Sequence, residues 1–253
     1  MSTSKIALVT GGSRGLGRNS ALHLAQAGHD LIITYRTQEA EAQEAVAQIE
    51  ALGRQAVALP LDTGRTATFP VFVAAVNEQL QHKWQRASFD FLINNAGIDA
   101  RSAFAETTEE DFDNLLNVHF KGVYFLTQNL LPLLADGGGV VNFSTGLARF
   151  TTPGYAAYAS MKGAVETLTK YMAKELGGRG IRANVVAPGI IKTDFTAAAR
   201  EAHPQLEQYM SANTALGRIG EPDDIGPIVA FLCSDAARWV NAQRLEASGG
   251  YSL

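Results

Sequence analysis

The segment YAAYASMK (155–162) carries two tyrosines and one lysine. On a helix, residues four positions apart lie on the same face, with Cβ atoms about 5–6 Å apart. This spacing pairs Tyr158 with Lys162, whereas Tyr155 has Ala159 at the matching position. A free phenol titrates near pH 10, and a neighbouring ammonium favours the phenolate. The spacing therefore predicts Tyr158 as a proton donor or acceptor whose pKa is lowered by Lys162. The same spacing also occurs on helices that have no catalytic role.

Short apolar runs alternate with helix-compatible stretches along the chain. The expected strands are residues 5–10, 30–35, 55–61, 89–95, 139–144, 181–187 and 243–248. The expected helices are residues 15–27, 38–52, 109–134, a helix around Tyr158, and residues 223–234. Apolar strands joined by helices indicate parallel pairing with helices on both faces. The fold class is therefore α/β: a single Rossmann-like doubly wound domain over residues 1–253, with a mostly parallel sheet of about seven strands.

In such sheets, ligands bind at the carboxyl ends of the strands. Here the first expected strand runs into TGGSRGLG (10–17), and a helix follows. Glycines let the backbone turn tightly beside a pyrophosphate, and a helix N-terminus supplies N–H groups and the positive end of the helix dipole. In this position the pattern predicts a dinucleotide-binding loop.

The second expected strand ends in Tyr35 and Arg36, where an NAD-binding fold often presents an acid to the ribose. Arg36 and Arg14 can instead pair with a 2′-phosphate through their planar guanidinium groups. The alternative is two solvated surface arginines. The residues therefore favour NADP(H) as the cofactor and leave NAD(H) possible.

Motifs along nearly the whole chain resemble those of the short-chain dehydrogenases/reductases, in the single-domain branch of 3-oxoacyl-carrier-protein reductases and related ketoreductases. The glycine loop resembles the family's TGxxxGxG, and NNAG (94–97) resembles its NNAG turn. YASMK (158–162) resembles its YxxxK, and PGIIKT (188–193) its PGxIxT segment. Residues 217–235 and the late SGG (248–250) resemble its downstream pattern.

The resemblance implies a role for each matched residue. Tyr158 would be the general acid in carbonyl reduction and the general base in alcohol oxidation. Lys162 would lower the pKa of Tyr158 and hold the nicotinamide ribose, and the positive charge of the oxidised nicotinamide would assist that shift. The other implied cofactor contacts are Gly11, Ser13, Arg14, Gly15, Leu16, Gly17, Arg36, Asp62, Thr63, Asn95, Ala96, Gly97, Pro188, Gly189, Ile191 and Thr193.

One departure from the family pattern lies thirteen residues before the tyrosine, where the family usually has a serine that hydrogen-bonds the substrate oxygen. This chain has Thr145 there, with Ser144 just before it. Threonine keeps a hydroxyl that donates and accepts. Neighbouring strand residues point to opposite sides, so we expect Thr145 to face the substrate, with Ser144 as the alternative.

The second departure lies in NVHFKGVYFL (117–126), where the family's asparagine aligns with His119 and not with Asn117. That asparagine normally helps to anchor a water that relays protons to the lysine. A histidine ring nitrogen can take this place, and a pKa near 6.5 would make such a relay sensitive to pH. The alternative is a satisfied helix histidine without a role in the relay.

Composition excludes several other classes of function. The 253-residue chain is 46% hydrophobic and 18% charged, as in well-packed globular proteins. Its net charge of −4 argues against a broad nucleic-acid surface. Apolar runs are too short for a membrane span or a signal peptide, and the single Cys233 fits a reducing compartment. We therefore expect a cytoplasmic protein with no nucleic-acid partner, no membrane partner and no bound metal.

The leading hypothesis is an NADP(H)-dependent oxidoreductase that exchanges a hydride with a ketone, a 3-oxoacyl thioester or a secondary alcohol. The alternatives are an NAD-linked sugar or steroid alcohol dehydrogenase and a catalytically silent nucleotide-sensing protein on the same fold. By resemblance, residues 195–218 would form a lid over the substrate. The resemblance also suggests a homo-oligomer, a dimer or tetramer, through the helices near residues 109–134 and 156–177. The sequence does not identify the substrate.

Overall fold

The computed structural model describes residues 4–194, 196–197 and 205–253. Its strands form one seven-stranded sheet in the order β3-β2-β1-β4-β5-β6-β7, and every neighbouring pair is parallel. The strands are β1 (Ile6–Val9), β2 (Asp30–Tyr35), β3 (Ala56–Pro60), β4 (Phe89–Asn94), β5 (Leu134–Phe143), β6 (Arg182–Pro188) and β7 (Arg244–Ala247). The doubly wound fold class is confirmed, and the strand order reverses between β1 and β4, where such folds bind their ligands.

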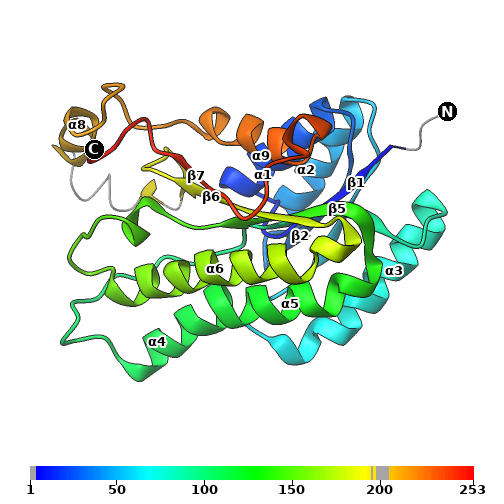
Figure 1. Ribbon diagram of the computed structural model, residues 1–253, viewed down its shortest axis with the longest axis horizontal. Coiled ribbons are helices and arrows are strands. Elements are labelled where there is room, and N and C mark those ends of the chain that lie inside the picture. Colours follow the sequence, from blue (N-terminus) through cyan, green and yellow to red (C-terminus); the bar gives the residue numbers. More distant parts are fainter. Residues whose placement is uncertain (1–3, 195, 198–204) are drawn as a thin grey trace.

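Helices cover both faces of the sheet (Figure 1). The helices are α1 (Gly15–Gln26), α2 (Glu39–Ala51), α3 (Phe69–Trp84), α4 (Glu109–Leu116), α5 (Gly122–Leu130), α6 (Ala156–Glu175), α8 (Gln205–Ala212) and α9 (Gly226–Leu232). One apolar core packs α1, α2 and α9 against the sheet, and a second packs α3, α5 and α6 against the other face. Because both faces are covered, the central strand β1 is apolar throughout, and all four of its residues are buried.

Helix α3 is absent from the helices expected from the sequence. It begins at Phe69 with a proline at its second position, where the missing N–H costs nothing. Its buried residues recur at helical spacing: Phe69, Phe72, Val76 and Leu80. This apolar stripe, which faces the second core, is the signal that identifies the helix.

The helical region expected over residues 109–134 is confirmed as far as Leu133, although the type of helix changes along it. Between α4 and α5 lies one turn of π-helix, Asn117–Lys121, and a short 3-10 turn at Leu131–Leu133 ends the helical run beside Pro132. Strand β5 then begins at Leu134, five residues before the expected start. The glycines at 137–139 belong to this strand, and a side chain at Gly138 would overlap the backbone of Asp90 on β4.

The start of α4 has two adjacent threonines, of which one caps the helix. Thr107 and Glu110 have the spacing of a capping box, but the cap is Thr108, whose hydroxyl accepts a hydrogen bond from the backbone N–H of Asp111 at 3.1 Å. Thr107 instead bonds Ser102 and the carbonyl of Ala103. Both threonines have an acid three residues later, so the spacing alone could not choose between them.

A buried row of polar side chains joins the sheet to α6. Asn94 on β4 donates to Asn142 on β5 at 2.8 Å and to Thr127 on α5 at 3.0 Å. Asn142 in turn donates to Thr169 on α6 at 2.8 Å. These groups are almost fully buried, so each bond avoids the cost of an unsatisfied polar group. The row fixes α6, the helix that carries Tyr158 and Lys162, against β4 and β5.

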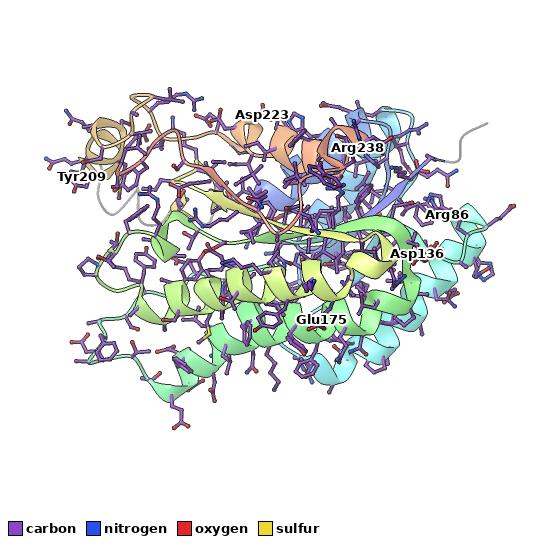
Figure 2. The ribbon with its side chains drawn as sticks, viewed as in Figure 1. Arg86, Asp136, Glu175, Tyr209, Asp223 and Arg238 are labelled. Carbon is purple, nitrogen blue, oxygen red and sulfur yellow. The ribbon has the colours of Figure 1, made fainter. Side chains whose placement is uncertain are left out.

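Charged side chains lie at the periphery of this layered structure. Asp136 and Asp223, labelled in Figure 2, are both strongly exposed, and their partners are Arg179 and His23. The single cysteine is the opposite case: Cys233 is fully buried, and burial raises the pKa of its thiol to about 12. Its thiol is therefore protonated and packs as a small apolar group in the first core.

Candidate active site

A cleft of about 730 Å³ lies at the carboxyl ends of the strands. It brings together segments that are far apart in the sequence: the glycine loop after β1, the turns after β2 to β6, the start of α6, α8 and the C-terminal residues. Of the predicted cofactor and catalytic residues, the cleft is lined by Gly11, Ser13, Arg14, Gly15, Leu16, Arg36, Asp62, Thr63, Asn95, Ala96, Gly97, His119, Thr145, Tyr158, Lys162, Pro188, Gly189, Ile191 and Thr193. Gly17 is the exception, because it is buried behind the loop.

The glycine loop fits a pyrophosphate. Gly11 has φ +64° and Gly15 has φ +55°, which are conformations that favour glycine. A Cβ at Gly17 would overlap the carbonyl of Gly11 and the amide of Asn95, so the close approach of α1 to the loop requires a glycine there. Helix α1 begins without a side-chain cap at Arg14, unlike α4 with Thr108. Its first N–H groups are therefore available to an anion.

Thr10 and Thr34, which were not among the predicted site residues, brace this loop. The Thr10 hydroxyl accepts hydrogen bonds from the backbone N–H groups of Asn95 and Ala96, both at 3.0 Å. The Asn95 amide donates to the carbonyls of Thr10 and Gly11 at 2.9 and 3.2 Å, and the Gly11 N–H donates to Thr34 at 3.1 Å. The loop after β1 and the turn after β4 are thus held as one unit. The sequence signal that could have identified Thr10 and Thr34 is a polar residue at the end of a buried strand.

Arg14 and Arg36 both line the cleft and both are exposed. The guanidinium of Arg14 lies 4.0 Å from the carboxylate of Asp194, so the ion pair between them is weak. Asp62 accepts a hydrogen bond from the N–H of Gly64 at 2.9 Å, so its carboxylate shapes the turn after β3. The two guanidinium groups at this end of the cleft suit a phosphate on the adenosine ribose.

Tyr158, Lys162 and Thr145 come together at the other end of the cleft. The Lys162 ammonium lies 5.7 Å from the centre of the Tyr158 ring and donates to the carbonyl of Phe143 at 2.9 Å. A hydrogen bond joins the side chains of Thr145 and Tyr158. Tyr158 and Lys162 are both buried, and burial lowers the pKa of Lys162 to about 8. Thr145 and not Ser144 therefore accompanies the tyrosine, as the alternation of strand residues predicts.

The prediction that the pKa of Tyr158 is lowered is wrong when only groups of the protein itself act on the phenol. Burial raises the pKa of the phenol above its usual value, and the charges of Asp99 and Tyr155 raise it further. The hydrogen bond with Thr145 acts in the opposite direction but is the smaller effect. Desolvation of the phenolate is the largest effect, because burial disfavours the charged form. Tyr158 is therefore protonated at neutral pH.

His119, which lines the cleft, is buried in the π-helical turn between α4 and α5. Its ring packs edge-on against Tyr158, with 5.1 Å between the ring centres. Its Nε2 lies 2.8 Å from the carbonyl oxygen of Ile98 and 3.2 Å from the N–H of the same residue. The shorter contact assigns Nε2–H as a donor, which leaves Nδ1 as an acceptor that is buried without a partner among the described residues.

The pKa of His119 is lowered to about 3, first by burial and then by the charge of Lys162. The imidazole is therefore neutral over the whole physiological range, and the expected pH sensitivity of a relay through its ring near pH 6.5 is wrong. The reason is that the ring is almost completely buried, which disfavours its charged form. A side chain at Gly97 would also lie 2.8 Å from this ring, so the histidine fits only beside a glycine.

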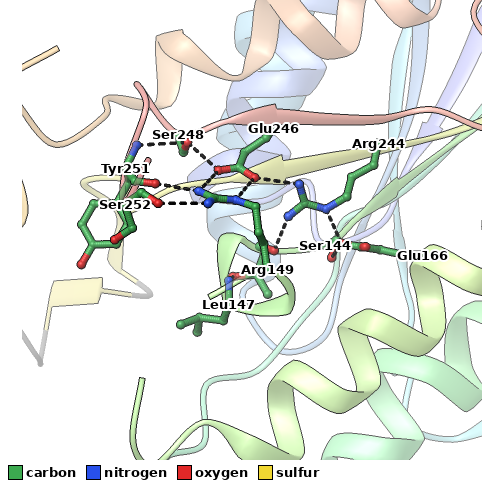
Figure 3. Close-up of polar contacts among 10 residues, drawn as sticks. Ser144, Leu147, Arg149, Glu166, Arg244, Glu246, Ser248, Tyr251 and Ser252 are labelled. Atoms are coloured by element: carbon green, nitrogen blue, oxygen red, sulfur yellow. Dashed lines mark hydrogen bonds and ion pairs between the residues drawn. The ribbon is translucent and has the colours of Figure 1, made fainter. Parts of the chain in front are cut away.

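Ser144 belongs to a network of hydrogen bonds and ion pairs with charged groups (Figure 3). Its hydroxyl donates to Glu166 at 2.6 Å, and Glu166 also accepts from Arg244 at 2.6 Å. Arg244 donates to the carbonyl of Thr145 at 3.0 Å and to Glu246 at 2.8 Å. The network thus holds the backbone of Thr145 in place from β7.

The same network fixes the C-terminal residues. Arg149 binds both carboxylate oxygens of Glu246, at 2.7 and 2.8 Å, and donates to the carbonyls of Tyr251 and Ser252. Tyr251 is buried, and its ring lies 5.0 Å from that of Phe150 at the cleft wall. The predicted site residues include neither Arg149 nor Tyr251, because their positions depend on contacts between residues about 100 positions apart.

The predicted lid, residues 195–218, is described only in part, since residues 195 and 198–204 lie outside the described residues. Of the remainder, Glu207 and Met210 on α8 line the cleft. The Tyr251 hydroxyl lies 3.1 Å from the sulfur of Met210, and residues 214–216 hydrogen-bond the backbone of residues 249–251. Helix α8 is thus joined to the C-terminal wall of the cleft.

The chain matches known proteins over its full length. Residues 11–252 match the family model described as enoyl-(acyl carrier protein) reductase. A 3-oxoacyl-[acyl-carrier-protein] reductase of Staphylococcus aureus is 34% identical, with 99% of each chain covered. Two solved structures superpose with a TM-score of 0.93. They are the promiscuous reductase LugOII of lugdunomycin biosynthesis, 35% identical over 99% of both chains, and the angucycline C-6 ketoreductase LanV with bound NADP, 34% identical over 99% of this chain and 96% of that one.

The chain belongs to the short-chain dehydrogenase/reductase family. This short-chain dehydrogenase/reductase is therefore an oxidoreductase that acts on a carbonyl or alcohol group with a nicotinamide cofactor. Within the part of the chain that the structure describes, no helix is long and apolar enough to cross a bilayer.

Proposed function

We propose that this enzyme is an NADP(H)-dependent ketoreductase that exchanges a hydride with a ketone, a 3-oxoacyl thioester or the corresponding secondary alcohol. The observation that carries the proposal is the meeting of Tyr158, Thr145 and Lys162 in the cleft that also contains the glycine loop. When bound, the reduced cofactor supplies the hydride. The residues of the chain then bind the substrate oxygen and supply the proton.

In this proposal Tyr158 donates its proton to the carbonyl oxygen, and the Thr145 hydroxyl donates a second hydrogen bond to that oxygen. The raised pKa of Tyr158 keeps the phenol protonated, which suits the direction of carbonyl reduction. Lys162, with a pKa of about 8, remains mostly charged at neutral pH and stabilises the phenolate that is left behind. His119, with its buried neutral ring, positions Ile98 and the Tyr158 ring.

The preference for NADP(H) rests on Arg14 and Arg36 at the cleft wall and on the lack of an acid at the end of β2. The residues proposed to hold the pyrophosphate are Gly11, Ser13, Gly15 and Leu16, with Gly17 supporting them from behind. We assign Asp62, Thr63, Asn95, Ala96 and Gly97 to the adenosine. We assign Pro188, Gly189, Ile191 and Thr193 to the nicotinamide end, beside Lys162. The relative LanV, whose structure contains NADP, supports this cofactor.

Tyr158→Phe tests the proposed general acid. The variant keeps the aromatic ring that packs against His119 but loses the proton. We expect NADPH to bind with nearly unchanged affinity and kcat for ketones to fall by about 10²–10⁴-fold, the usual contribution of a general acid. Cofactor fluorescence measures the binding, and the loss of NADPH absorbance measures turnover. Full activity in Tyr158→Phe would reject the assignment, and wild-type protein that binds NADPH without reducing any ketone would favour a nucleotide-sensing role.

The proposed single domain and homo-oligomer have support of different kinds. One sheet contains strands from both ends of the described chain, which supports a single domain. Exposed aromatic side chains on α4, α5 and α6 support a dimer or tetramer through these helices: Phe112, Tyr124, Phe125 and Tyr171. A monomer mass by light scattering would contradict the proposed oligomer.

A further inference from the structure

The turn after β4 places one acid in the cleft. The Nε2–H of His119 donates to the carbonyl of Ile98 at 2.8 Å and thereby fixes the backbone immediately before Asp99. On the other side of Asp99, the N–H of Ser102 donates to the carbonyl of Gly154 at 3.0 Å. Asp99 is therefore presented from a turn that is anchored at both ends, to the helix below and to the loop before α6.

The carboxylate of Asp99 differs from the other acids of the cleft. Asp62 accepts a backbone hydrogen bond, Glu207 pairs with Lys192 at 3.1 Å, and Asp194 lies near Arg14. Asp99 is exposed on the cleft wall, and among the described residues it has no hydrogen bond and no ion pair within 4 Å. An acceptor of this kind, close enough to Tyr158 and Tyr155 for its charge to act on both, is available to a molecule in the cleft.

The surroundings of Asp99 restrict the chemistry of its partner. The guanidinium of Arg101 lies 5.8 Å from the Tyr155 ring centre, and its positive charge already acts on Asp99. This charge disfavours a second cation beside the carboxylate. Aromatic and apolar side chains also line the cleft: Leu147, Phe150, Tyr155 and Tyr251. Such a site suits a neutral, mainly apolar molecule that has one hydrogen-bond donor.

We infer that Asp99 is a substrate-recognition residue, which accepts a hydrogen bond from an alcohol or phenol hydroxyl on a ring-containing ketone. The inference rests on the proposed ketoreductase function and narrows its substrate class. While Tyr158 and Thr145 bind the carbonyl oxygen at one side of the cleft, Asp99 binds the hydroxyl from the turn after β4. The two contacts together orient the ring between the aromatic walls. Loss of the hydroxyl would leave a charged acceptor without a partner in a partly closed cleft, and such a loss weakens binding.

The test compares kcat/KM for α-tetralone with kcat/KM for its monohydroxylated isomers, with NADPH as the reductant. In the wild-type enzyme we expect at least one isomer to be favoured over the parent ketone by about ten-fold or more, the range that a hydrogen bond to a charged group supplies. In Asp99→Ala we expect this ratio to fall close to one. In Asp99→Asn, which keeps a neutral acceptor, we expect an intermediate ratio.

The matched control is Glu78→Ala, which removes the same charge from an exposed position on α3 outside the cleft and should leave the ratio unchanged. If Asp99 acts only through the charge felt by Tyr158, all ketones will change together, the ratio will stay constant, and the inference will be wrong. A wild-type enzyme that favours no hydroxylated isomer would overturn it as well, even if Asp99→Ala does not fold. Failure of the proposed function is a separate result, because the parent ketone would then also go unreduced.

Discussion

At the glycine-loop end of the cleft, hydrogen bonds between uncharged side chains and the backbone hold the chain, whereas at the Tyr158 end charged side chains from distant segments hold it. Short hydrogen bonds of the Thr10 hydroxyl and the Asn95 amide join the glycine loop to the NNAG turn. At the Tyr158 end, the network consists of Arg149, Arg244, Glu166 and Glu246 (Figure 3).

The difference follows from what each end is proposed to bind. A pyrophosphate has the same shape in every enzyme of this cofactor class, so backbone N–H groups and glycines suffice to bind it. A substrate pocket must differ from one enzyme to the next, and side chains on loops can change without loss of the sheet. We therefore expect substitutions at the first end to affect folding and cofactor binding together. At the second end, substitutions should affect substrate KM while cofactor binding is unchanged.

Of the substitutions considered, Gly17→Ala should have the largest effect on stability and cofactor binding. The Cβ of the new alanine would overlap the backbone of Gly11 and the Asn95 amide. We expect a loss of about 1–3 kcal/mol in the free energy of unfolding, as for overpacked sites, and at least a ten-fold loss in NADPH affinity. Denaturant unfolding and fluorescence titration measure the two effects. The control is Gly163→Ala on α6, where an added Cβ meets no atom within 4 Å and should stabilise the helix by about 0.5–1 kcal/mol. Equal behaviour of the two variants would show that the close packing of α1 on the loop has no importance.

Arg36→Ala should have a smaller and more selective effect at the same end. If Arg36 binds a 2′-phosphate, NADPH affinity should fall by about ten-fold or more while NADH affinity stays the same, because a charged hydrogen bond is lost only with the phosphate. Isothermal titration with both cofactors measures this difference. Arg238→Ala, an exposed arginine outside the cleft that is labelled in Figure 2, serves as the control. A parallel change for NADH and NADPH would instead favour the NAD-linked alternative.

Glu246→Gln should have the smallest effect at neutral pH, and it tests the Tyr158 end. Weaker bonds to Arg149 and Arg244 should loosen Tyr251 and the backbone of Thr145, so we expect KM for ketones to rise by about three- to ten-fold with NADPH affinity unchanged. The control, Asp136→Asn, weakens a remote surface ion pair with Arg179. A change in NADPH affinity as large as the change in KM would contradict the proposed division between the two ends.

The same variant gives a pH test of the network. Hydrogen bonds from Arg149, and then from Arg244 and Ser248, lower the pKa of Glu246 from 4.5 to about 2. A lowered pKa in the folded state means that the stabilisation is complete above pH 4.5 and is lost as the pH falls towards 2. The wild-type protein should therefore lose stability more steeply than Glu246→Gln over this interval. Parallel acid unfolding curves would show that the network does not stabilise the fold through this carboxylate.

Some features of this protein could be predicted from local sequence alone. Strand β2 has the predicted bounds, residues 30–35, because a buried parallel strand is a continuous apolar run bounded by turn residues. The glycine loop, the NNAG turn and the pair of Tyr158 and Lys162 are also local, since their meaning depends on spacings of a few residues. The fold class follows from the alternation of such runs.

The tertiary structure decided the rest, because the physical causes act between distant segments. The π-helical turn at Asn117–Lys121 and the early start of β5, where Gly138 lies close to β4, cannot be predicted from helical periodicity. The pKa values of Tyr158 and His119 depend on burial, which outweighs the effect of neighbours in the sequence. The Arg149–Glu246 bonds and the free carboxylate of Asp99 exist only once the C-terminus, the loop before α6 and the turn after β4 have met.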